Sequence, residues 1–257
     1  MMLEIKNLNV TYNVKESSSA DGRAVRDLSL SLPEESFSAL IGESGSGKST
    51  VLMTLLGLLP SGAFASGEIS YRGNNILNAP EETLARLRQR EIALIPQGAL
   101  NSFTPVITIG RHIEEVLYVH LGLKGDVARQ RITELLAEVE LPADTARRYP
   151  HELSGGQKQR AAIALALSCA PKLVLADEPT TALDVITQAA ILKLLERLRR
   201  DKKLTVLLVT HDLPLAASAC DMLFVMKDGR LIENGSPKNL IEAPREAHTK
   251  ALIAAML

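Results

Sequence analysis

Alternating apolar and polar residues mark the start of the chain as β structure. Leu3 and Ile5 alternate with polar residues, and the pattern then shifts register to Leu8 and Val10, which predicts a strand with a bulge. A second alternating run places apolar residues at Leu28, Leu30 and Leu32. The polar stretch between the two runs, NVKESSSADGR, predicts a loop. The chain therefore opens with antiparallel strands, and GEISYRGNNI adds a short strand and a turn.

Short uninterrupted apolar runs predict buried strands further along the chain. These runs are SFSALIG, IALIP, KLVLADEP and LTVLLVTH. The last two are separated by a predicted helix whose apolar stripe consists of Ile191, Leu194, Leu195 and Leu198. Two apolar strands joined by a helix are typical of a parallel βαβ unit. The final run, MLFVMKDGRLIENG, predicts a hairpin that turns at Asp228 and Gly229.

Between Gly98 and Ala170 the pattern is helical, and it predicts no strand. One predicted helix there, VARQRITELLAEVEL, has its apolar face at Val127, Ile132, Leu135, Leu136 and Val139. We therefore expect a helical subdomain at about 98–170, inserted into a unit made of 1–96 and 171–257. That unit is expected to combine an α/β core with an antiparallel β subdomain, and 236–257 is expected to form a C-terminal helical tail.

Composition favours an ordinary folded domain in the cytosol. At 257 residues and 46% hydrophobic content, the chain can bury a sizeable core. Its 29 basic and 30 acidic residues nearly cancel, so no nucleic-acid partner is expected. Cys169 and Cys220 lack metal or disulfide spacing and are expected to be buried thiols. The start of the sequence shows no secretory signal, and the longest apolar run, VLMTLLGLL, is shorter than the roughly 18 residues of a membrane span.

A glycine-rich segment supplies the first candidate chemistry. GESGSGKS fits the phosphate-loop pattern G-x-x-x-x-G-K-[ST], with an apolar strand before it and a helix after it. In such a loop backbone N–H groups wrap the β-phosphate, Lys48 meets the β- and γ-oxygens, and Ser49 offers a hydroxyl to Mg²⁺. The alternative is a Gly/Ser turn that merely starts a helix. The residues expected to bind nucleotide are Gly42, Ser44, Gly45, Gly47, Lys48, Ser49 and Thr50, with Thr50 at the α-phosphate.

Polar residues follow two of the predicted strands. Asp177 ends KLVLAD, where α/β sheets bind ligands, and is a candidate metal ligand. Glu178 points differently and is a candidate for orienting and polarising an attacking water. The alternative for this pair is a strand that ends in a polar turn before Pro179. His211 follows the next strand and could contact the γ-phosphate and the water, although a lone histidine at a strand end is more often a satisfied surface or core residue.

The segment LSGGQKQR raises a question about its two glycines. Ser154 and Gln157 have the S-x-x-Q spacing of a capping box at a helix start, and we expect a helix from about Gly155. A capping box explains neither Gly155 nor Gly156, which weaken the first turn unless something approaches the backbone. A helix N-terminus with exposed N–H groups is suited to an anion.

Together these motifs resemble the ATP-binding subunits of ABC transporters, and the resemblance covers nearly the whole chain. GESGSGKST is similar to their Walker A motif, LVLADEP to Walker B, LSGGQKQR to the signature motif, TALD to the D-loop and LLVTHD to the switch-histidine motif. The resemblance implies an α/β fold: a P-loop NTPase core with a mostly parallel sheet, an N-terminal antiparallel β subdomain and a helical insertion subdomain. It also implies an ATPase that uses ATP and Mg²⁺.

Further site residues follow from the resemblance. Two such subunits are expected to meet head to tail, so that Ser154, Gly155, Gly156 and Gln157 bind the γ-phosphate of ATP held by the other subunit. Gln97, in LIPQGAL, matches the Q-loop glutamine that links the γ-phosphate and Mg²⁺ to the helical subdomain; the alternative is an ordinary loop glutamine. The implied metal ligands are Ser49, Asp177 and Gln97, and the implied catalytic residues are Glu178, His211 and Gln97.

Two residues have both a functional and a structural interpretation. Asp184 of the D-loop is expected to lie across the dimer interface, and it is also suited to cap a helix that begins near Val185. Tyr12 occupies the place of the aromatic residue that stacks on adenine in this family, although a tyrosine that ends a strand is common.

The resemblance extends to one branch of the family. GLLPSGAFASGEI, EPTTALDVITQAAIL and EAPREAHTKALIAA are similar to the importers of peptides, opine-type metallophores and nickel, although His248 is followed directly by Thr249 where that branch usually has His-Pro-Tyr-Thr. The Cys-rich extension of some relatives is absent, so no iron–sulfur cluster is expected.

Membership of this branch implies a set of partners. They are a second ATPase subunit, identical or paralogous, two transmembrane permease subunits and, indirectly, an extracytoplasmic solute-binding protein. The expected location is the cytoplasmic face of the plasma membrane. The alternatives are a soluble ABC ATPase acting on ribosomes, nucleic acid or Fe–S assembly, and a P-loop kinase, which would leave LSGGQ and the D-loop without a purpose.

Overall fold

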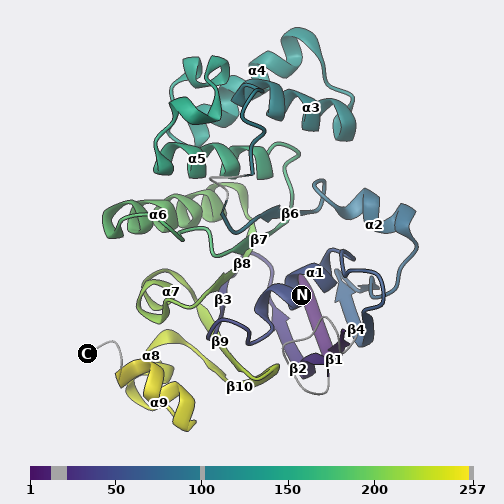
Figure 1. The fold of residues 1–257 in the computed structure, drawn as a ribbon, viewed down its shortest axis with the longest axis vertical. Coiled ribbons are helices and arrows are strands. Elements are labelled where there is room, and N and C mark those ends of the chain that lie inside the picture. The colour runs from purple at the N-terminus through teal and green to yellow at the C-terminus, as the bar shows by residue number, and fades with distance from the viewer. Residues whose placement is uncertain (13–21, 99–101, 255–257) are drawn as a thin grey trace. The chain divides into compact units, whose positions relative to one another are not determined.

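A computed structural model describes residues 1–12, 22–98 and 102–254 (Figure 1). The expected loop at 13–21 and residues 99–101 of the segment after Gln97 lie outside the described residues. Contacts divide the chain into two compact units: Met1–Ala85 with Thr205–Leu257, and Arg86–Leu204. Each unit is described by itself.

The first unit contains a four-stranded antiparallel sheet. Its strands are β1 (Leu3–Thr11), β2 (Arg23–Leu32), β4 (Phe64–Tyr71) and β5 (Asn74–Asn75), in the order β2-β1-β4-β5. The register between β1 and β2 shifts between Ile5 and Leu8, which confirms the predicted bulge. The apolar residues predicted to alternate along both strands are buried, so this sheet follows the sequence pattern closely.

The first unit also contains the strands that lead to the phosphate loop. β3 (Phe37–Ile41) is parallel to β8 (Thr205–Thr210) and to β9 (Met222–Lys227), and β10 (Arg230–Gly235) pairs antiparallel with β9. Asp228 and Gly229 have positive φ angles of 48° and 80°, which confirms the predicted two-residue hairpin turn. The helices of the first unit are α1 (Lys48–Leu55), α7 (Leu213–Ala219), α8 (Pro237–Glu242) and α9 (Ala247–Ala254).

The second unit combines a parallel strand pair with a group of helices. β6 (Ile92–Ile95) pairs with β7 (Leu173–Asp177), and α6 (Val185–Lys202) buries its predicted leucine and isoleucine stripe. Figure 1 shows α3 (Ile109–Leu121), α4 (Gly125–Glu138) and α5 (Gly155–Ala166) close together. The short helices η2 (Ala143–Arg147) and η3 (Pro150–Glu152) lie between α4 and α5 in the chain. The remaining helix, α2 (Glu81–Leu87), lies where the chain passes from one unit to the other.

The prediction that Val127 belongs to the buried face of α4 is wrong. Val127 is 61% exposed, whereas Ala128 is fully buried together with Leu135 and Leu136. Ala128 lies four residues before Ile132 and therefore shares its face of the helix. The position on the helix, and not the size of the apolar side chain, decides that Ala128 is buried and Val127 is not.

Candidate active site

The phosphate loop joins β3 to α1, and its backbone requires glycine. Gly47 has φ = 101°, and a Cβ atom on it would lie 2.3 Å from the carbonyl oxygen of Ala24. A Cβ atom on Gly42 would lie 2.3 Å from the carbonyl oxygen of Met226. Gly45 also has a positive φ, 82°, but has open space around it. Two glycines of the motif are thus fixed by close backbone packing, in addition to any ligand.

Lys48 is held inside its own loop. Its ammonium group donates hydrogen bonds to the carbonyl oxygens of Gly42, at 2.7 Å, and Glu43, at 2.8 Å. The Oγ atom of Ser46 lies 3.4 Å from the same nitrogen, and the residue is only 5% exposed. A lysine ammonium beside a helix N-terminus is suited to the phosphates of a nucleotide.

The hairpin between β9 and β10 supports this loop. The N–H group of Gly229 donates to the carbonyl oxygen of Ser46 at 3.1 Å, and the N–H group of Arg26 donates to the carbonyl oxygen of Gly229 at 2.8 Å. The sequence predicts the hairpin but not this contact, because the two segments lie about 180 residues apart in the chain.

Tyr12 and His211 also belong to the first unit. The hydroxyl group of Tyr12 donates to Oγ1 of Thr50 at 3.2 Å, so a residue expected at adenine contacts one expected at the α-phosphate. His211 follows β8 and is exposed. The next residue, Asp212, caps α7 by accepting the N–H group of Leu215 at 2.8 Å.

In the second unit, Asp177 ends β7, and Glu178 follows it in a different environment. Asp177 is 5% exposed, as expected for the last residue of a buried strand. Glu178 has φ = 43°, a left-handed conformation that is unfavourable for a side chain of this size. Its carboxylate accepts hydrogen bonds from Nε2 of Gln97 at 3.1 Å and from Oγ1 of Thr181 at 3.0 Å. The structure thus brings together Gln97 and Glu178, two residues predicted to be catalytic.

The signature segment forms the predicted capping box. Ser154 Oγ accepts the N–H group of Gln157 at 3.3 Å, and Gln157 Oε1 accepts the N–H group of Ser154 at 3.0 Å. A Cβ atom on Gly156 would lie 2.8 Å from Cγ2 of Thr187. The close packing of Thr187 therefore favours glycine at position 156, whether or not a ligand approaches the backbone there. Helix α5 begins at Gly155, as predicted.

Asp184 caps α6. Its carboxylate accepts the side-chain hydroxyl of Thr187 at 2.6 Å and the N–H group of the same residue at 3.0 Å. These two hydrogen bonds, the hydroxyl first, hold the pKa of Asp184 below its ordinary value. Thr187 therefore lies against Gly156 and also donates two hydrogen bonds to Asp184. Neither contact was predicted from the sequence. The place of Thr187 three residues after the cap was the available signal.

A metal ion at this site would have few protein ligands. No group of three or more His, Cys, Asp or Glu side chains suited to a metal occurs within the described ranges. Mg²⁺ needs no such cluster, since it is usually held by one or two carboxylates, waters and the phosphates of its nucleotide. Each unit carries an oxygen donor of the kind that Mg²⁺ prefers, the Ser49 hydroxyl in the first unit and the Asp177 carboxylate in the second. No helix in the part of the chain that the structure describes is long and apolar enough to cross a membrane.

Similarity to known proteins identifies the class. The family model described as "ABC transporter" matches residues 25–181, and the chain belongs to this family. It has the ABC ATPase fold, an α/β fold with a mostly parallel sheet and an antiparallel β subdomain, and it is an ATPase that uses ATP with Mg²⁺.

Particular relatives narrow the comparison. The chain is 38% identical over 257 residues to the oligopeptide transport ATP-binding protein OppD of Escherichia coli, an alignment that covers 99% of this chain and 75% of OppD. It is 40% identical over 262 residues to a putative peptide import ATP-binding protein of Brucella melitensis, covering 99% and 77% of the two chains. Among solved structures, the dimeric ABC transporter cassette MJ0796 matches with a TM-score of 0.79 and 32% identity over 92% of this chain and 99% of the cassette. The same cassette is also known in a post-hydrolysis dimer bound to ADP and Pi.

Proposed function

We propose that this chain is the ATP-hydrolysing subunit of a peptide importer. The observation that carries the proposal is the presence in one chain of two different helix starts, an uncapped one behind a glycine loop at α1 and a serine-capped one at α5. The names of the relatives, which refer to oligopeptide transport and peptide import, support the substrate class.

Binding of the nucleotide is assigned to the phosphate loop. In this proposal backbone N–H groups of the loop hold the β-phosphate, and Lys48, which two carbonyl oxygens of the loop position, meets the β- and γ-oxygens. Ser49 and Asp177 hold Mg²⁺, and Gln97 joins them when the γ-phosphate is present. Tyr12 stacks on the adenine ring, and Thr50 contacts the α-phosphate.

Hydrolysis is assigned to the group around Glu178. Its carboxylate orients and polarises the attacking water, while the hydrogen bonds from Gln97 and Thr181 fix its position before the nucleotide arrives. His211 contacts the γ-phosphate and the water from the end of β8.

Dimer closure is assigned to the signature segment. Ser154, Gly155, Gly156 and Gln157 bind the γ-phosphate held by the second subunit, and Asp184 lies at the dimer interface. Contact with two helix N-termini and a lysine stabilises the triphosphate in the closed state, and hydrolysis removes that stabilisation.

The partners and the location follow from this role. We propose a second ATPase subunit, identical or paralogous, two permease subunits in the plasma membrane and a solute-binding protein reached through them. The chain would sit at the cytoplasmic face, with the segment after Gln97 facing the permease.

The test is to tag the chain, solubilise native membranes gently and identify the co-purifying proteins by mass spectrometry. Recovery of two multi-spanning permease subunits supports the proposal. Recovery from the soluble fraction with ribosomal or nucleic-acid factors contradicts it. A Glu178→Gln variant run in parallel should retain the same partners, because it alters hydrolysis and not assembly.

A further inference from the structure

A small cavity adjoins the phosphate loop, and a residue from near the end of the chain lines it. The cavity has a volume of about 70 Å³. Three segments of the first unit surround it: the phosphate loop, the β9–β10 turn and helix α9. The lining residues are 43–46, 226–228 and His248.

His248 is an unusual residue for this position. Its side chain is 9% exposed, and Nδ1 lies 4.0 Å from Oε1 of Glu43 in the phosphate loop. Nε2 is buried and meets no hydrogen-bond partner among residues 1–12, 22–98 and 102–254. A buried polar atom in this state costs free energy, so an apolar side chain would serve simple packing better. The other charged residues of the cavity lining are Lys227 and Asp228.

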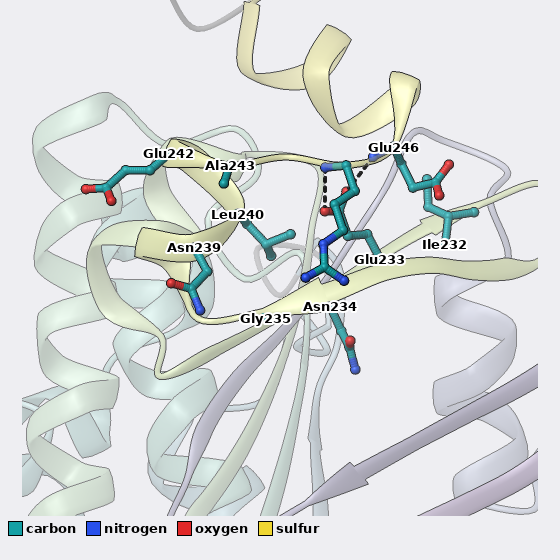
Figure 2. Close-up of a pocket in the computed structure, with 10 residues that line it drawn as sticks. Ile232, Glu233, Asn234, Gly235, Asn239, Leu240, Glu242, Ala243 and Glu246 are labelled. Atoms are coloured by element: carbon teal, nitrogen blue, oxygen red, sulfur yellow. Dashed lines mark hydrogen bonds between the residues drawn. The ribbon is translucent and has the colours of Figure 1, made fainter.

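The start of α9 is tied to β10 by Glu233. Its carboxylate accepts the N–H group of Arg245 at 2.8 Å and that of Glu246 at 3.1 Å, and Figure 2 shows these hydrogen bonds beside a larger cavity of about 450 Å³. Partial burial works to raise the pKa of Glu233, but these two N–H groups hold it below its ordinary value. Helix α9 is therefore anchored immediately before His248.

The part of the loop that faces His248 also sets the position of Lys48. The carbonyl oxygen of Glu43 accepts the Lys48 ammonium at 2.8 Å, and the carbonyl oxygen of Ser46 accepts the N–H group of Gly229 at 3.1 Å. A shift of this segment would therefore move the cation that we assign to the β- and γ-phosphates.

We propose that α9 braces the phosphate loop, with His248 as a positioning residue that sets the affinity for ATP. The brace has two ends: Glu233 fixes the two residues that precede α9, and His248 lies against the loop beside Glu43. The proposal rests on the assignment of the phosphate loop as the ATP site. It adds a link between the C-terminal helix and nucleotide affinity.

The test measures ATP affinity and turnover separately in the full chain. Calorimetric titration with ATP in the absence of Mg²⁺ gives Kd while the nucleotide stays intact, and steady-state hydrolysis with Mg²⁺ gives KM and kcat. We expect His248→Ala to weaken ATP binding and raise KM by about three- to fivefold, the range of a single polar contact, with kcat unchanged. His248→Gln, which keeps a polar end of similar reach, should restore most of the affinity.

Three further variants distinguish positioning from packing. Glu43→Ala combined with His248→Ala should weaken binding no more than either change alone, because both remove the same contact. Glu233→Ala should reproduce the effect of His248→Ala. Lys250→Ala, an exposed change on the same helix, is the matched control and should bind ATP normally.

Two outcomes overturn the brace. One is an unchanged Kd in His248→Ala; the other is a loss in His248→Gln equal to that in His248→Ala, which would indicate packing alone. Lys48→Ala is measured alongside: if it binds ATP normally, the assigned ATP site itself is wrong. If only Lys48→Ala loses binding, the site stands and the brace fails.

Discussion

Helices α1 and α5 both begin at motifs that place this chain in its family, but their first turns are satisfied in different ways. The N-cap of α1 is Gly47, in the left-handed conformation, and no side chain caps the helix. The N-cap of α5 is Ser154, which exchanges hydrogen bonds with Gln157 in a complete capping box. Every helix start leaves N–H groups that need partners. No side chain caps α1, whereas α5 supplies capping partners from its own sequence.

The difference matches the two roles that we propose. A loop that binds nucleotide within one chain can turn its backbone N–H groups toward the phosphates when no side chain caps the helix behind it. A helix that meets a phosphate only when a second subunit arrives must be stable before that event, and the capping box stabilises it. We therefore expect changes at α1 to abolish nucleotide binding, and changes at α5 to affect dimer closure.

The largest expected effect is at the α1 end. Lys48→Ala removes the cation assigned to the β- and γ-phosphates and should lower the hydrolysis rate by about 10³-fold, together with ATP affinity. Titration with ATP and a steady-state hydrolysis assay measure the two losses. Lys238→Ala, at an exposed position on α8, is the matched control. Hydrolysis within a few-fold of wild type in Lys48→Ala would contradict the role of the uncapped helix start.

Glu178→Gln separates chemistry from binding. Because the carboxylate is assigned to the attacking water and not to the phosphates, turnover should fall by about 10²-fold while ATP still binds. Light scattering should then show a dimer that persists in ATP, since the closed state is no longer resolved by hydrolysis. Normal turnover in this variant would remove Glu178 from the role of base.

A comparison of two serine caps addresses the α5 end. Ser154→Ala and Ser236→Ala each remove a capping hydroxyl, the latter at α8, where Ser236 accepts the N–H group of Asn239 at 3.3 Å. Both should lower the free energy of unfolding by about 1 kcal/mol, measured by urea titration. Only Ser154→Ala should also weaken ATP-dependent dimerisation, by roughly tenfold, because it removes a hydrogen bond to a charged phosphate.

Two results would contradict this assignment. If Ser154→Ala and Ser236→Ala behave alike in dimerisation, the signature serine acts only as a helix cap. A Ser154→Arg variant that still dimerises with ATP would exclude a phosphate at the start of α5, because the larger side chain would occupy its place.

Local features were predictable from the sequence because they depend on neighbours in the chain. The bulge in β1, the Asp228–Gly229 hairpin and the caps at Ser154 and Asp184 follow from spacing and turn chemistry, and the structure confirms them. The close approach of Gly156 to Thr187, and the contact of His248 with the phosphate loop, depend on tertiary packing that no local pattern encodes. The functional roles of the site residues remain predictions.

The smallest expected effect concerns how α5 is held behind its first turn. Arg160 of the signature segment donates to the carbonyl oxygen of Val139 at 3.0 Å and pairs with the Glu140 carboxylate, which also binds Arg197 of α6 at 3.0 Å. The hydrogen bond from Arg160 is the main reason that the pKa of Glu140 is lowered, and partial burial opposes it. A lowered pKa in the folded state means that this stabilisation is present above the unfolded pKa, about 4.3, and is lost as the pH falls through the folded value.

Glu140→Gln should therefore be less stable than wild type at pH 7, and the difference should shrink as the pH falls below about 4. Because Glu140 is 54% exposed, the difference at pH 7 should be no more than about 1 kcal/mol. Urea titrations across the pH range measure it, with Glu115→Gln at an exposed site on α3 as the control. A difference that does not change with pH would show that Glu140 supports α5 through packing. The body of the helix would then be held without a charged contact, as its start is held by the neutral capping box of Ser154 and Gln157.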